Sequence, residues 1–430
     1  MTERTYRPET LAVHAGQIPD PSTSARAVPV YRTTAYQFRN SEHGANLFAL
    51  KELGNIYARL MNPTNDVLEK RLADLEGGAA GLSLSSGTAA TYFTVTNILK
   101  TGDELVSAVN LYGGTYTMFD AILPQQCNIT VRFVPVNDFK ATEAAINPKT
   151  RAIFIETIGN PVLDVADVQG YAELARKHRL PLLVDSTFST PALQRPIEHG
   201  ADVVIHSLSK WIGGHGAGIG GLVVDAGKFD WKDPKFDLYN EPDRGYHGLR
   251  FAHDLGPLSP IAFALRLRTV GLRNQGPTLA PDAAWIFLQG VESLFLRMER
   301  HSSNALKVAE YLSAHDKVGW VRYPGLPGDP ANALAQKYLK NGAGGMVVFG
   351  LKKGQEAAIK LVDNIKLFSL LANVGDAKSL IIHSASTTHS QLSGEAQSAG
   401  GLHGDLVRLS IGIEHIDDII GALEDALKLV

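Results

Sequence analysis

Short runs of β-branched and other apolar residues alternate with helical stretches through the middle of this chain, and this alternation limits most strongly how it can fold. One helical stretch covers residues 168–178, and the apolar runs are Leu105-Val-Ser-Ala-Val, Ala152-Ile-Phe-Ile, Leu182-Leu-Val, Val203-Val-Ile and Leu222-Val-Val. Continuous apolar runs are typical of strands that are buried on both faces. Alternation of such strands with helices predicts an α/β fold with a mostly parallel central sheet flanked by helices.

The chain has 430 residues, which exceeds the size at which a single core keeps growing, so we expect more than one domain. We predict an extended N-terminal arm over residues 1–60, a large domain over 61–290 and a smaller C-terminal α/β domain over 291–430. A polar, aromatic insertion over about 228–259 interrupts the large domain, either as a mobile surface loop or as a contact that shapes the substrate entrance. Its aromatic content favours the contact. In the C-terminal domain we predict helices over 291–312 and 417–429 and a strand at Gly345-Met-Val-Val-Phe.

The composition is that of an ordinary globular protein. Apolar residues make up 44% and charged residues 20%, and the formal net charge of -3 provides no basic field for nucleic acid or a membrane surface. The N-terminus lacks the apolar core of a signal peptide and no apolar run approaches membrane-spanning length, so we expect a cytoplasmic protein. The single cysteine, Cys127, excludes an internal disulfide. His383 and His389 lie in a Ser/Thr loop without partners that would complete a metal site, so we expect no metal.

A lysine follows one of the predicted strands, among hydroxyls and glycines. Residues 201–216 begin as an apolar run and then break into Ser207-Leu-Ser209-Lys210-Trp-Ile-Gly-Gly, which predicts a strand ending in a loop. Desolvation of Lys210 would lower its pKa, so that its neutral amine could attack a carbonyl to form a Schiff base. The two serines could hold a phosphate. Asp185 ends another buried strand, where ligands of open α/β sheets gather, and could pair with a pyridinium nitrogen.

The glycines after this loop raise a different possibility, a dinucleotide-binding site. Gly216, Gly218 and Gly221 match the pattern G-x-G-x-x-G. That fingerprint requires a strand before it and a helix after it, whereas residues 221–225 predict another strand. An NAD(P)-dependent oxidoreductase therefore stays a distant alternative, and a binding protein without catalytic activity is a further one.

Two other segments have the composition of phosphate-binding elements. Ser86, Gly87 and Thr88 stand at the predicted start of a helix, where free N–H groups and a partial positive charge suit a phosphate. An ordinary Ser/Thr helix cap is the alternative. Tyr57 and Arg59 stand two apart in an extended stretch, so their side chains share a face and could bind a phosphate together. A surface ion pair and a packed ring are the alternative for these two residues.

Taken together, these motifs resemble the pyridoxal-phosphate (PLP) enzymes of cysteine and methionine metabolism. Six of them occur in order along nearly the whole chain: Tyr57-Ala-Arg59…Asn62-Pro63-Thr64, Ser86-Gly87-Thr88, Tyr112-Gly-Gly-Thr115, Glu156-Thr-Ile-Gly-Asn160-Pro161, Asp185-Ser-Thr and Ser207-Leu-Ser-Lys210. The resemblance implies fold type I of the PLP-dependent enzymes, which is aspartate aminotransferase-like, with pyridoxal 5'-phosphate as the cofactor. It also implies a homotetramer built from dimers that share their active sites.

The resemblance further implies a role for each matched residue. Lys210 would hold PLP covalently, Asp185 would pair with the ring nitrogen, Tyr112 would stack on the ring and serve as an acid or base, and Asn160 would hydrogen-bond the phenolic oxygen. Arg408 would bind the substrate α-carboxylate, assisted by the stretch around Asn373 and by Tyr57. The phosphate would be bound by Ser86, Gly87, Thr88, Ser207 and Ser209 of one subunit and by Tyr57 and Arg59 of its neighbour.

Within the family, residues 156–161, 210–216 and 384–391 are most similar to the O-acetylhomoserine sulfhydrylase branch. This implies a γ-replacement in methionine biosynthesis, in which O-acetyl-L-homoserine and sulfide give L-homocysteine and acetate. Cystathionine γ-synthase, O-succinylhomoserine sulfhydrylase and methionine γ-lyase are the alternatives. Gly114 stands where methionine γ-lyases often carry a cysteine, which disfavours the lyase. Asn373, in place of a serine, and Ala217, in place of a hydroxyl residue, leave the substrate preference open.

Overall fold

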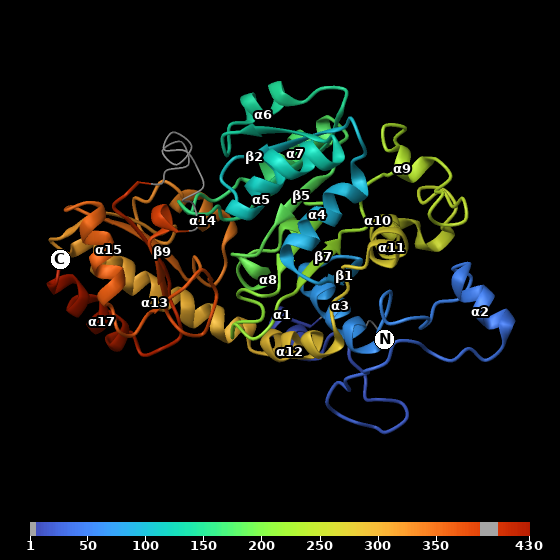
Figure 1. The fold of residues 1–430 in the computed structure, drawn as a ribbon, viewed down its shortest axis with the longest axis horizontal. Coiled ribbons are helices and arrows are strands. Elements are labelled where there is room, and N and C mark those ends of the chain that lie inside the picture. Colours follow the sequence, from blue (N-terminus) through green and yellow to red (C-terminus); the bar gives the residue numbers. More distant parts are fainter. Residues whose placement is uncertain (1–5, 388–402) are drawn as a thin grey trace.

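The structure is a computed structural model that describes residues 6–387 and 403–430, so that His389 lies outside the described residues. Two β-sheets with their covering helices lie side by side in it (Figure 1). Within the described ranges, none of the helices has both the length and the apolarity that a membrane crossing requires.

The larger sheet has seven strands in the order β1-β7-β6-β5-β4-β2-β3. The strands from β6 to β3 run parallel, and β7 is antiparallel to both β6 and β1. The predicted, mostly parallel sheet is therefore confirmed. Its strands are β1 (Ala80–Leu84), β2 (Glu104–Ala108), β3 (Thr130–Val134), β4 (Thr150–Glu156), β5 (Leu182–Asp185), β6 (Val203–Ser207) and β7 (Gly221–Asp225).

Helices cover both faces of this sheet. In β5, Leu182 and Val184 join the hydrophobic core on one face, whereas Leu183 joins the core on the other face. Both faces of the strand are therefore apolar, which explains why its sequence shows no polar alternation. One face packs against α3 (Pro63–Glu76), α7 (Val168–Lys177) and α12 (Pro281–Glu292), and the other packs against α4 (Gly87–Ile98), the π-helical η1 (Met118–Cys127) and α10 (Ala262–Arg266).

Helix α10 continues without a break through the π-helical η4 (Leu267–Leu272) into α11 (Arg273–Gln275). Further short helices of this part of the chain lie in the connections between the longer elements. They are α5 (Gly113–Thr117), α6 (Phe139–Ala145), α8 (Thr190–Leu193) and the 3-10 turns η2 (Pro196–His199) and η3 (Gly256–Ile261).

Local sequence explains where α3 begins and ends. The side chain of Asn62 caps its first turn, and Pro63 occupies a position where no backbone N–H is needed. Gly77 ends the helix in the left-handed conformation, at a φ of 74°. Leu68 and Leu72 lie one turn apart and are both fully buried, so this face of α3 packs on the sheet.

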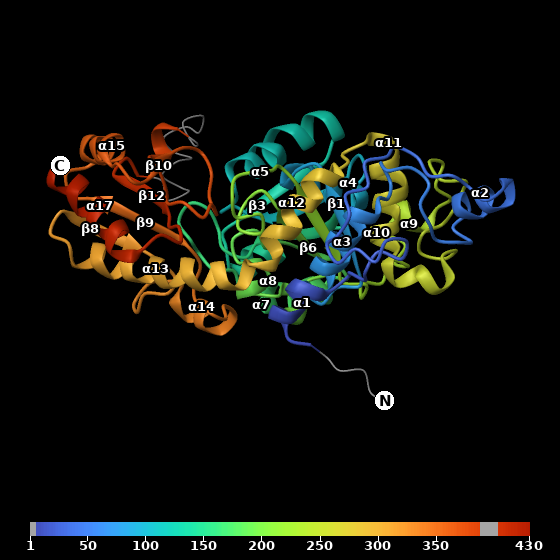
Figure 2. The same cartoon turned by 90° about the horizontal axis from the view of Figure 1, so that it is seen from below.

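The smaller sheet has five strands in the order β10-β11-β12-β9-β8. The predicted helix over 291–312 corresponds to α13, but Val291 belongs to α12, because the chain breaks helical geometry at Ser293. Figure 2 shows α12 and α13 leading in succession from the larger sheet to the smaller one. The domain boundaries themselves stay predictions.

The strands of the smaller sheet are β8 (Val318–Arg322), β9 (Met346–Leu351), β10 (Ser369–Leu370), β11 (Leu380–Ile382) and β12 (Leu406–Ser410). The helices of this part of the chain are α13 (Leu294–Ala314), α14 (Asn332–Tyr338), α15 (Gln355–Asn364), η5 (Ser384–Ser386) and α17 (Ile416–Lys428).

Two short helices interrupt the N-terminal arm, which we expected to be extended. Helix α1 (Pro8–His14) packs on α3 and α12, and α2 (Ser41–Phe48) lies away from the sheet (Figure 1). Local capping accounts for both, because Pro8 suits a first helical turn and the side chain of Asn40 accepts a hydrogen bond from the backbone N–H of His43.

Five aromatic residues of the 228–259 insertion are buried: Trp231, Phe236, Tyr239, Tyr246 and Phe251. Trp231 stacks on Tyr239 with 4.3 Å between ring centroids, and both rings are buried in the core on the α4 face. The Tyr239 hydroxyl accepts a hydrogen bond from Asn97 of α4 at 3.0 Å. The insertion, which contains α9 (Asp237–Asn240), therefore packs on the helical layer, and none of its residues lines the central cavity of its own subunit.

Candidate active site

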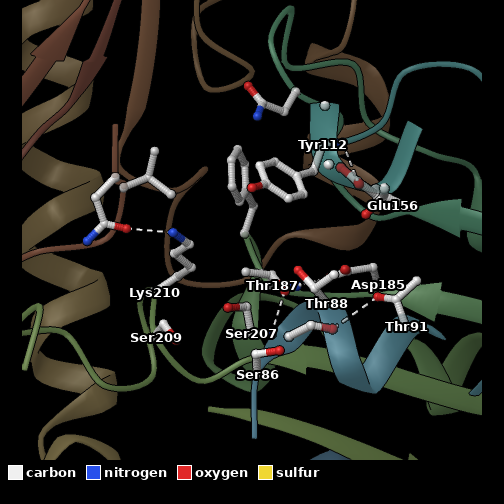
Figure 3. A pocket seen from close by; sticks show the side chains of 18 of the residues that line it. Ser86, Thr88, Thr91, Tyr112, Glu156, Asp185, Thr187, Ser207, Ser209 and Lys210 are labelled. Carbon is white, nitrogen blue, oxygen red and sulfur yellow. Dashed lines mark hydrogen bonds between the residues drawn. The ribbon is translucent and has the colours of Figure 1, made fainter. Parts of the chain in front are cut away.

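A cavity of ≈ 510 Å³ opens at the carboxyl ends of β4, β5 and β6, and residues from both sheets line it (Figure 3). Open α/β sheets bind their ligands at this edge. The structure brings together all but two of the predicted site residues. Those that line the cavity are Ser86, Gly87, Thr88, Tyr112, Asn160, Asp185, Ser207, Ser209, Lys210, Asn373 and Arg408.

Lys210 lies in the turn after β6, and its amine points into the cavity. Its Nζ donates a hydrogen bond to Oδ1 of Asn373 at 2.6 Å. Burial, and to a smaller extent the positive charge of Arg408, lowers the pKa of Lys210. The amide of Asn373 holds the amine without adding a negative charge that would raise this pKa again. Lys210 is therefore suited to react as a neutral nucleophile.

Two carboxylates end neighbouring strands at the floor of the cavity. Glu156 of β4 and Asp185 of β5 are register partners. Burial and repulsion from Asp185 raise the pKa of Glu156 well above its usual value, and burial raises the pKa of Asp185. A positively charged ligand group next to Asp185 would favour its anion and reverse that shift. Asp185 was predicted from the sequence, whereas Glu156 was not predicted as a site residue, although it begins one of the quoted motifs.

Tyr112 stands immediately before α5 and is 53% exposed in the isolated subunit. Its backbone N–H donates a hydrogen bond to Oε1 of Glu156 at 2.7 Å. The ring lies against Gly114, where an added Cβ would stand 2.6 Å from Cε1 of Tyr112. Figure 3 shows Tyr112 and Lys210 reaching into the cavity from different sides. The backbone of Tyr112 is thus fixed by Glu156, and the absence of a side chain at Gly114 makes room for the ring.

The start of α4 forms one end of the cavity. Gly87 is the first residue of α4, and the hydroxyl of Ser86 caps the helix by accepting a hydrogen bond from the N–H of Ala89 at 3.0 Å. Ser207 packs closely here, because a Cβ on Gly87 would lie 2.5 Å from Cβ of Ser207. Free N–H groups, the partial positive charge of a helix N-terminus and the hydroxyls of Thr88 and Ser207 together suit an anion.

Arg408 of β12 supplies a buried positive charge from the smaller sheet. Its Nη1 donates a hydrogen bond to Oδ1 of Asn160 at 3.2 Å. Burial lowers the pKa of Arg408 to about 10, so the guanidinium stays charged at neutral pH. The contact with Asn160 uses one of the five donors of a guanidinium, and a carboxylate suits this forked geometry.

Tyr57 and Arg59 do not line the cavity of their own subunit. Both are exposed, and the Arg59 guanidinium lies over the Tyr57 ring at 5.2 Å from its centroid. Nη1 of Arg59 also donates to the backbone carbonyl of Arg273 at 2.5 Å. The arm thus presents both side chains on the surface of the subunit.

Residues 9–428 match the sequence pattern of the family described as Cys/Met metabolism PLP-dependent enzymes. The chain belongs to this family. It is a PLP-dependent enzyme of fold type I. Its relatives match nearly the whole length of the chain. It is 51% identical to the O-acetyl-L-homoserine sulfhydrylase of Leptospira meyeri, covering 99% of this chain and 97% of that protein. It is also 51% identical to the homocysteine synthase of Schizosaccharomyces pombe, covering 98% of each chain.

A solved structure supports the same assignment. The crystal structure of a Campylobacter jejuni protein described as an O-acetylhomoserine (thiol)-lyase superposes with a TM-score of 0.95 and 40% sequence identity, covering 98% of this chain and 100% of that one. It contains N'-pyridoxyl-lysine-5'-monophosphate, a lysine joined to the cofactor.

The groups around the cavity fit PLP. The amine of Lys210 suits an aldehyde, the carboxylate of Asp185 suits a pyridinium nitrogen, and the N-terminus of α4 suits a phosphate. The described ranges contain no group of histidine, cysteine, aspartate and glutamate side chains that could hold a metal ion.

Proposed function

We propose that this PLP-dependent enzyme, a transferase, converts O-acetyl-L-homoserine and sulfide to L-homocysteine and acetate, the direct sulfhydrylation step of methionine biosynthesis. The observation that carries this proposal is the 51% identity to the O-acetyl-L-homoserine sulfhydrylase of Leptospira meyeri over 99% of the chain. In this reaction the bond between Cγ and the acetate oxygen breaks, and a bond between Cγ and the sulfur of hydrosulfide forms.

Bound PLP supplies an electron sink that stabilises negative charge on the substrate. In our proposal Lys210 holds its aldehyde carbon, and the anion of Asp185 keeps its ring nitrogen protonated. Tyr112 stacks on the ring and Asn160 hydrogen-bonds its phenolic oxygen. The phosphate lies at the start of α4, bound by Ser86, Gly87, Thr88, Ser207 and Ser209, all of which line the cavity.

Arg408 binds the substrate α-carboxylate through its forked donors, which orients the Cα–H bond for removal of the proton. Asn373 lines the same cavity, and Tyr57 of the neighbouring subunit borders the same space in our proposal. These contacts position the substrate.

The amine of Lys210 moves protons at Cα and then at Cβ once substrate has displaced it from the cofactor. Its lowered pKa suits this role, because a base whose pKa is near the operating pH transfers protons most effectively. Tyr112 is the second acid or base, since its ring enters the cavity from a different side (Figure 3).

We further propose a cytoplasmic homotetramer of active-site-sharing dimers, in which Tyr57 and Arg59 complete the phosphate site of the neighbour. Both side chains are exposed and lie outside their own cavity. A second groove of ≈ 530 Å³ adjoins the cavity, because both are lined by Thr88, Gly113 and Gly114. Tyr92, Phe93, Met118 and Ile122 make this groove largely apolar, which suits an arm from a second subunit.

The reaction is tested by incubating the purified holoenzyme with O-acetyl-L-homoserine and sulfide and measuring homocysteine by mass spectrometry. Parallel reactions with cysteine, with O-succinyl-L-homoserine and without a thiol separate the proposed activity from cystathionine γ-synthase, the succinyl-specific sulfhydrylase and γ-lyase. A holoenzyme that forms no homocysteine from O-acetyl-L-homoserine and sulfide would refute the proposed reaction.

Subunit sharing is tested with hybrid assemblies. A Lys210→Ala subunit paired with an Arg59→Ala subunit contains one site with both changes and one site with neither. Random mixing of equal amounts makes about half of the pairs mixed, and one of the two sites in each mixed pair is intact. The mixture should therefore have about a quarter of the wild-type activity, although each variant alone is weakly active. Activity that stays at the level of the parents would show that the two residues act within one subunit.

A further inference from the structure

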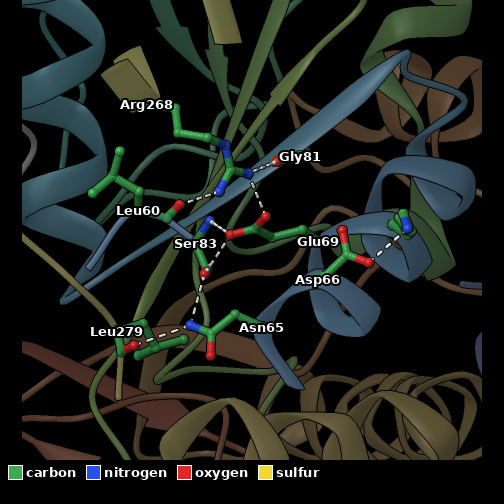
Figure 4. A network of polar contacts seen from close by, with 9 residues as sticks. Leu60, Asn65, Asp66, Glu69, Gly81, Ser83, Arg268 and Leu279 are labelled. Carbon is green, nitrogen blue, oxygen red and sulfur yellow. Dashed lines mark hydrogen bonds and ion pairs between the residues drawn. The ribbon is translucent and has the colours of Figure 1, made fainter. Parts of the chain in front are cut away.

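A polar network at the side of the larger sheet joins the end of the N-terminal arm to α3 and η4 (Figure 4). Nη1 of Arg268, on η4, donates to the backbone carbonyl of Leu60 at 2.5 Å. Nη2 of the same guanidinium donates to Oε2 of Glu69, on α3, at 2.5 Å and to the carbonyl of Gly81 at 3.4 Å. Leu60 directly follows Arg59, so this guanidinium holds the arm one residue away from the proposed phosphate ligand.

Glu69 is fixed from its other side as well. Its Oε1 accepts hydrogen bonds from the backbone N–H of Ser83 at 2.9 Å and from the Ser83 hydroxyl at 2.7 Å. Asn65 then donates to the Ser83 hydroxyl at 3.2 Å and to the carbonyl of Leu279 at 3.0 Å. The side chain of Glu69 is 6% exposed and that of Arg268 is 20% exposed. Such a buried ion pair adds little net stability, but its geometry is rigid because both oxygens of Glu69 and both terminal nitrogens of Arg268 have partners.

The same continuous helix makes a second contact with the arm. Arg273, at the end of this helix, accepts the hydrogen bond from Nη1 of Arg59 through its carbonyl. The last carbonyls of a helix have no partner within the helix and carry partial negative charge, so they favour a guanidinium. Just beyond the helix, the hydroxyl of Thr278 donates to the carbonyl of Arg59 at 3.2 Å. The arm is thus held at the Leu60 carbonyl, the Arg59 carbonyl and the Arg59 side chain.

We propose that Arg268 is a positioning residue for the cofactor site of the neighbouring subunit. By fixing the Leu60 carbonyl between η4 and α3, it sets the direction in which Tyr57 and Arg59 leave their own subunit. Without this contact the segment would sample more conformations, and ordering it on the neighbour's phosphate would weaken cofactor binding. The inference rests on the proposed function, in which Arg59 binds that phosphate.

The test replaces Arg268 by lysine in the full-length protein. Lysine keeps a positive charge next to Glu69, but its single ammonium group lacks the planar fork that reaches Leu60 and Glu69 together. Apoprotein is titrated with PLP, and the mass of the assembly is measured by light scattering. We expect the Kd for PLP to rise about tenfold in Arg268→Lys, with an unchanged assembly, and to rise at least as much in Arg59→Ala. In the double variant the Kd should rise by less than the product of the two single effects, because both changes act on the contact of Arg59 with the phosphate.

Arg250→Lys is the matched control, since Arg250 forms an ion pair with Asp254 at 2.8 Å within the insertion and, among the described residues, forms no hydrogen bond or ion pair with the arm. Its Kd for PLP should equal that of the wild type. If Arg268→Lys does not assemble, Thr278→Val removes the hydroxyl that holds Arg59 while leaving the ion pair intact. That variant should also raise the Kd, and its effect combined with Arg59→Ala should be smaller than the product of the two single effects.

The outcomes separate this inference from the proposed function. A raised Kd in Arg59→Ala together with an unchanged Kd in Arg268→Lys, or effects that multiply in the double variant, would overturn the positioning role alone. An unchanged Kd in Arg59→Ala would overturn the shared phosphate site, and the positioning role with it.

Discussion

Replacing Gly87 by alanine tests whether the start of α4 is the phosphate end of the cofactor site. A Cβ on residue 87 would lie 2.5 Å from Cβ, 2.8 Å from Oγ and 2.9 Å from Cα of Ser207. Gly87 does not have the left-handed backbone that only glycine adopts readily. The substitution therefore introduces a steric contact without backbone strain, and Ser207 must move away from the helix to relieve it.

Two opposing effects set the stability of this variant. Alanine is favoured over glycine in a helix by up to about 1 kcal/mol, whereas overpacking a close contact costs about 1–3 kcal/mol. The free energy of unfolding of the apoprotein should fall by no more than about 3 kcal/mol, so the variant should fold. Displacement of Ser207 should cost the phosphate at least one charged hydrogen bond, worth about 1.5–3 kcal/mol. The Kd for PLP should therefore rise by about 10- to 100-fold.

The assay titrates apoprotein with PLP and follows the absorbance of the bound cofactor, and urea unfolding reports stability. Gly421→Ala is the matched control, because a Cβ at this position in α17 has no atom within 4 Å. That variant should gain about 0.5–1 kcal/mol of stability and bind PLP as the wild type does. A folded Gly87→Ala protein with an unchanged Kd for PLP would refute the assignment of the phosphate to the start of α4.

Three further substitutions test other parts of the site and of the core. Hydride reduction of the holoenzyme followed by peptide mass spectrometry should find the cofactor on Lys210 and should find none on Lys210→Ala; a label on another lysine contradicts the assignment. Arg408→Lys loses the forked donors of the guanidinium. The KM for O-acetyl-L-homoserine should therefore rise by about 10- to 100-fold, with a smaller change in kcat. An unchanged KM would contradict the binding of the substrate carboxylate by Arg408. Burial raises the pKa of Asp225 from 3.8 to about 7, so the stability that its protonated form contributes is present below about pH 4 and is lost as the pH rises through 7. The N–H of Gly227 donates to Oδ1 of Asp225 and the N–H of Ala264 to Oδ2. Asp225→Asn keeps only one of these two acceptors, so the variant should be less stable at every pH, but it removes the titrating group. Its unfolding free energy should therefore fall less between pH 4 and 8 than that of the wild type, and parallel pH profiles contradict this cause.

Much of the cofactor site could be predicted because its motifs are local. Ser207 ends a strand that its own apolar sequence predicts, and Ser209 and Lys210 follow it. Ser86 caps a helix that begins with Gly87 and Thr88. Asp185 ends a strand in the same way. In each case the position of the side chain at a strand or helix end follows from neighbouring residues, so no distant contact is needed to place it.

Other features depend on contacts that sequence patterns do not encode. The partnership of Glu156 with Asp185 arises from the register between two parallel strands, and the contact of Asn373 with Lys210 joins the two sheets. The helices of the N-terminal arm were missed because proline and threonine dominate that segment, whereas local caps are enough to form short helices. The aromatic insertion could not be placed, because burial of its rings depends on surfaces of α4 and α10 that form only in the folded chain.

The amino-acid sequence by itself determined the α/β architecture, the family and many of the residues that line the candidate site, because strand and helix periodicity and short motifs are properties of neighbouring residues. Only the tertiary structure decided that Glu156 supports Tyr112, that Asn373 holds the amine of Lys210, and that Arg268 grips the arm beside Arg59. These contacts join residues far apart in the chain, and their geometry is fixed by how the sheets and helices pack against one another.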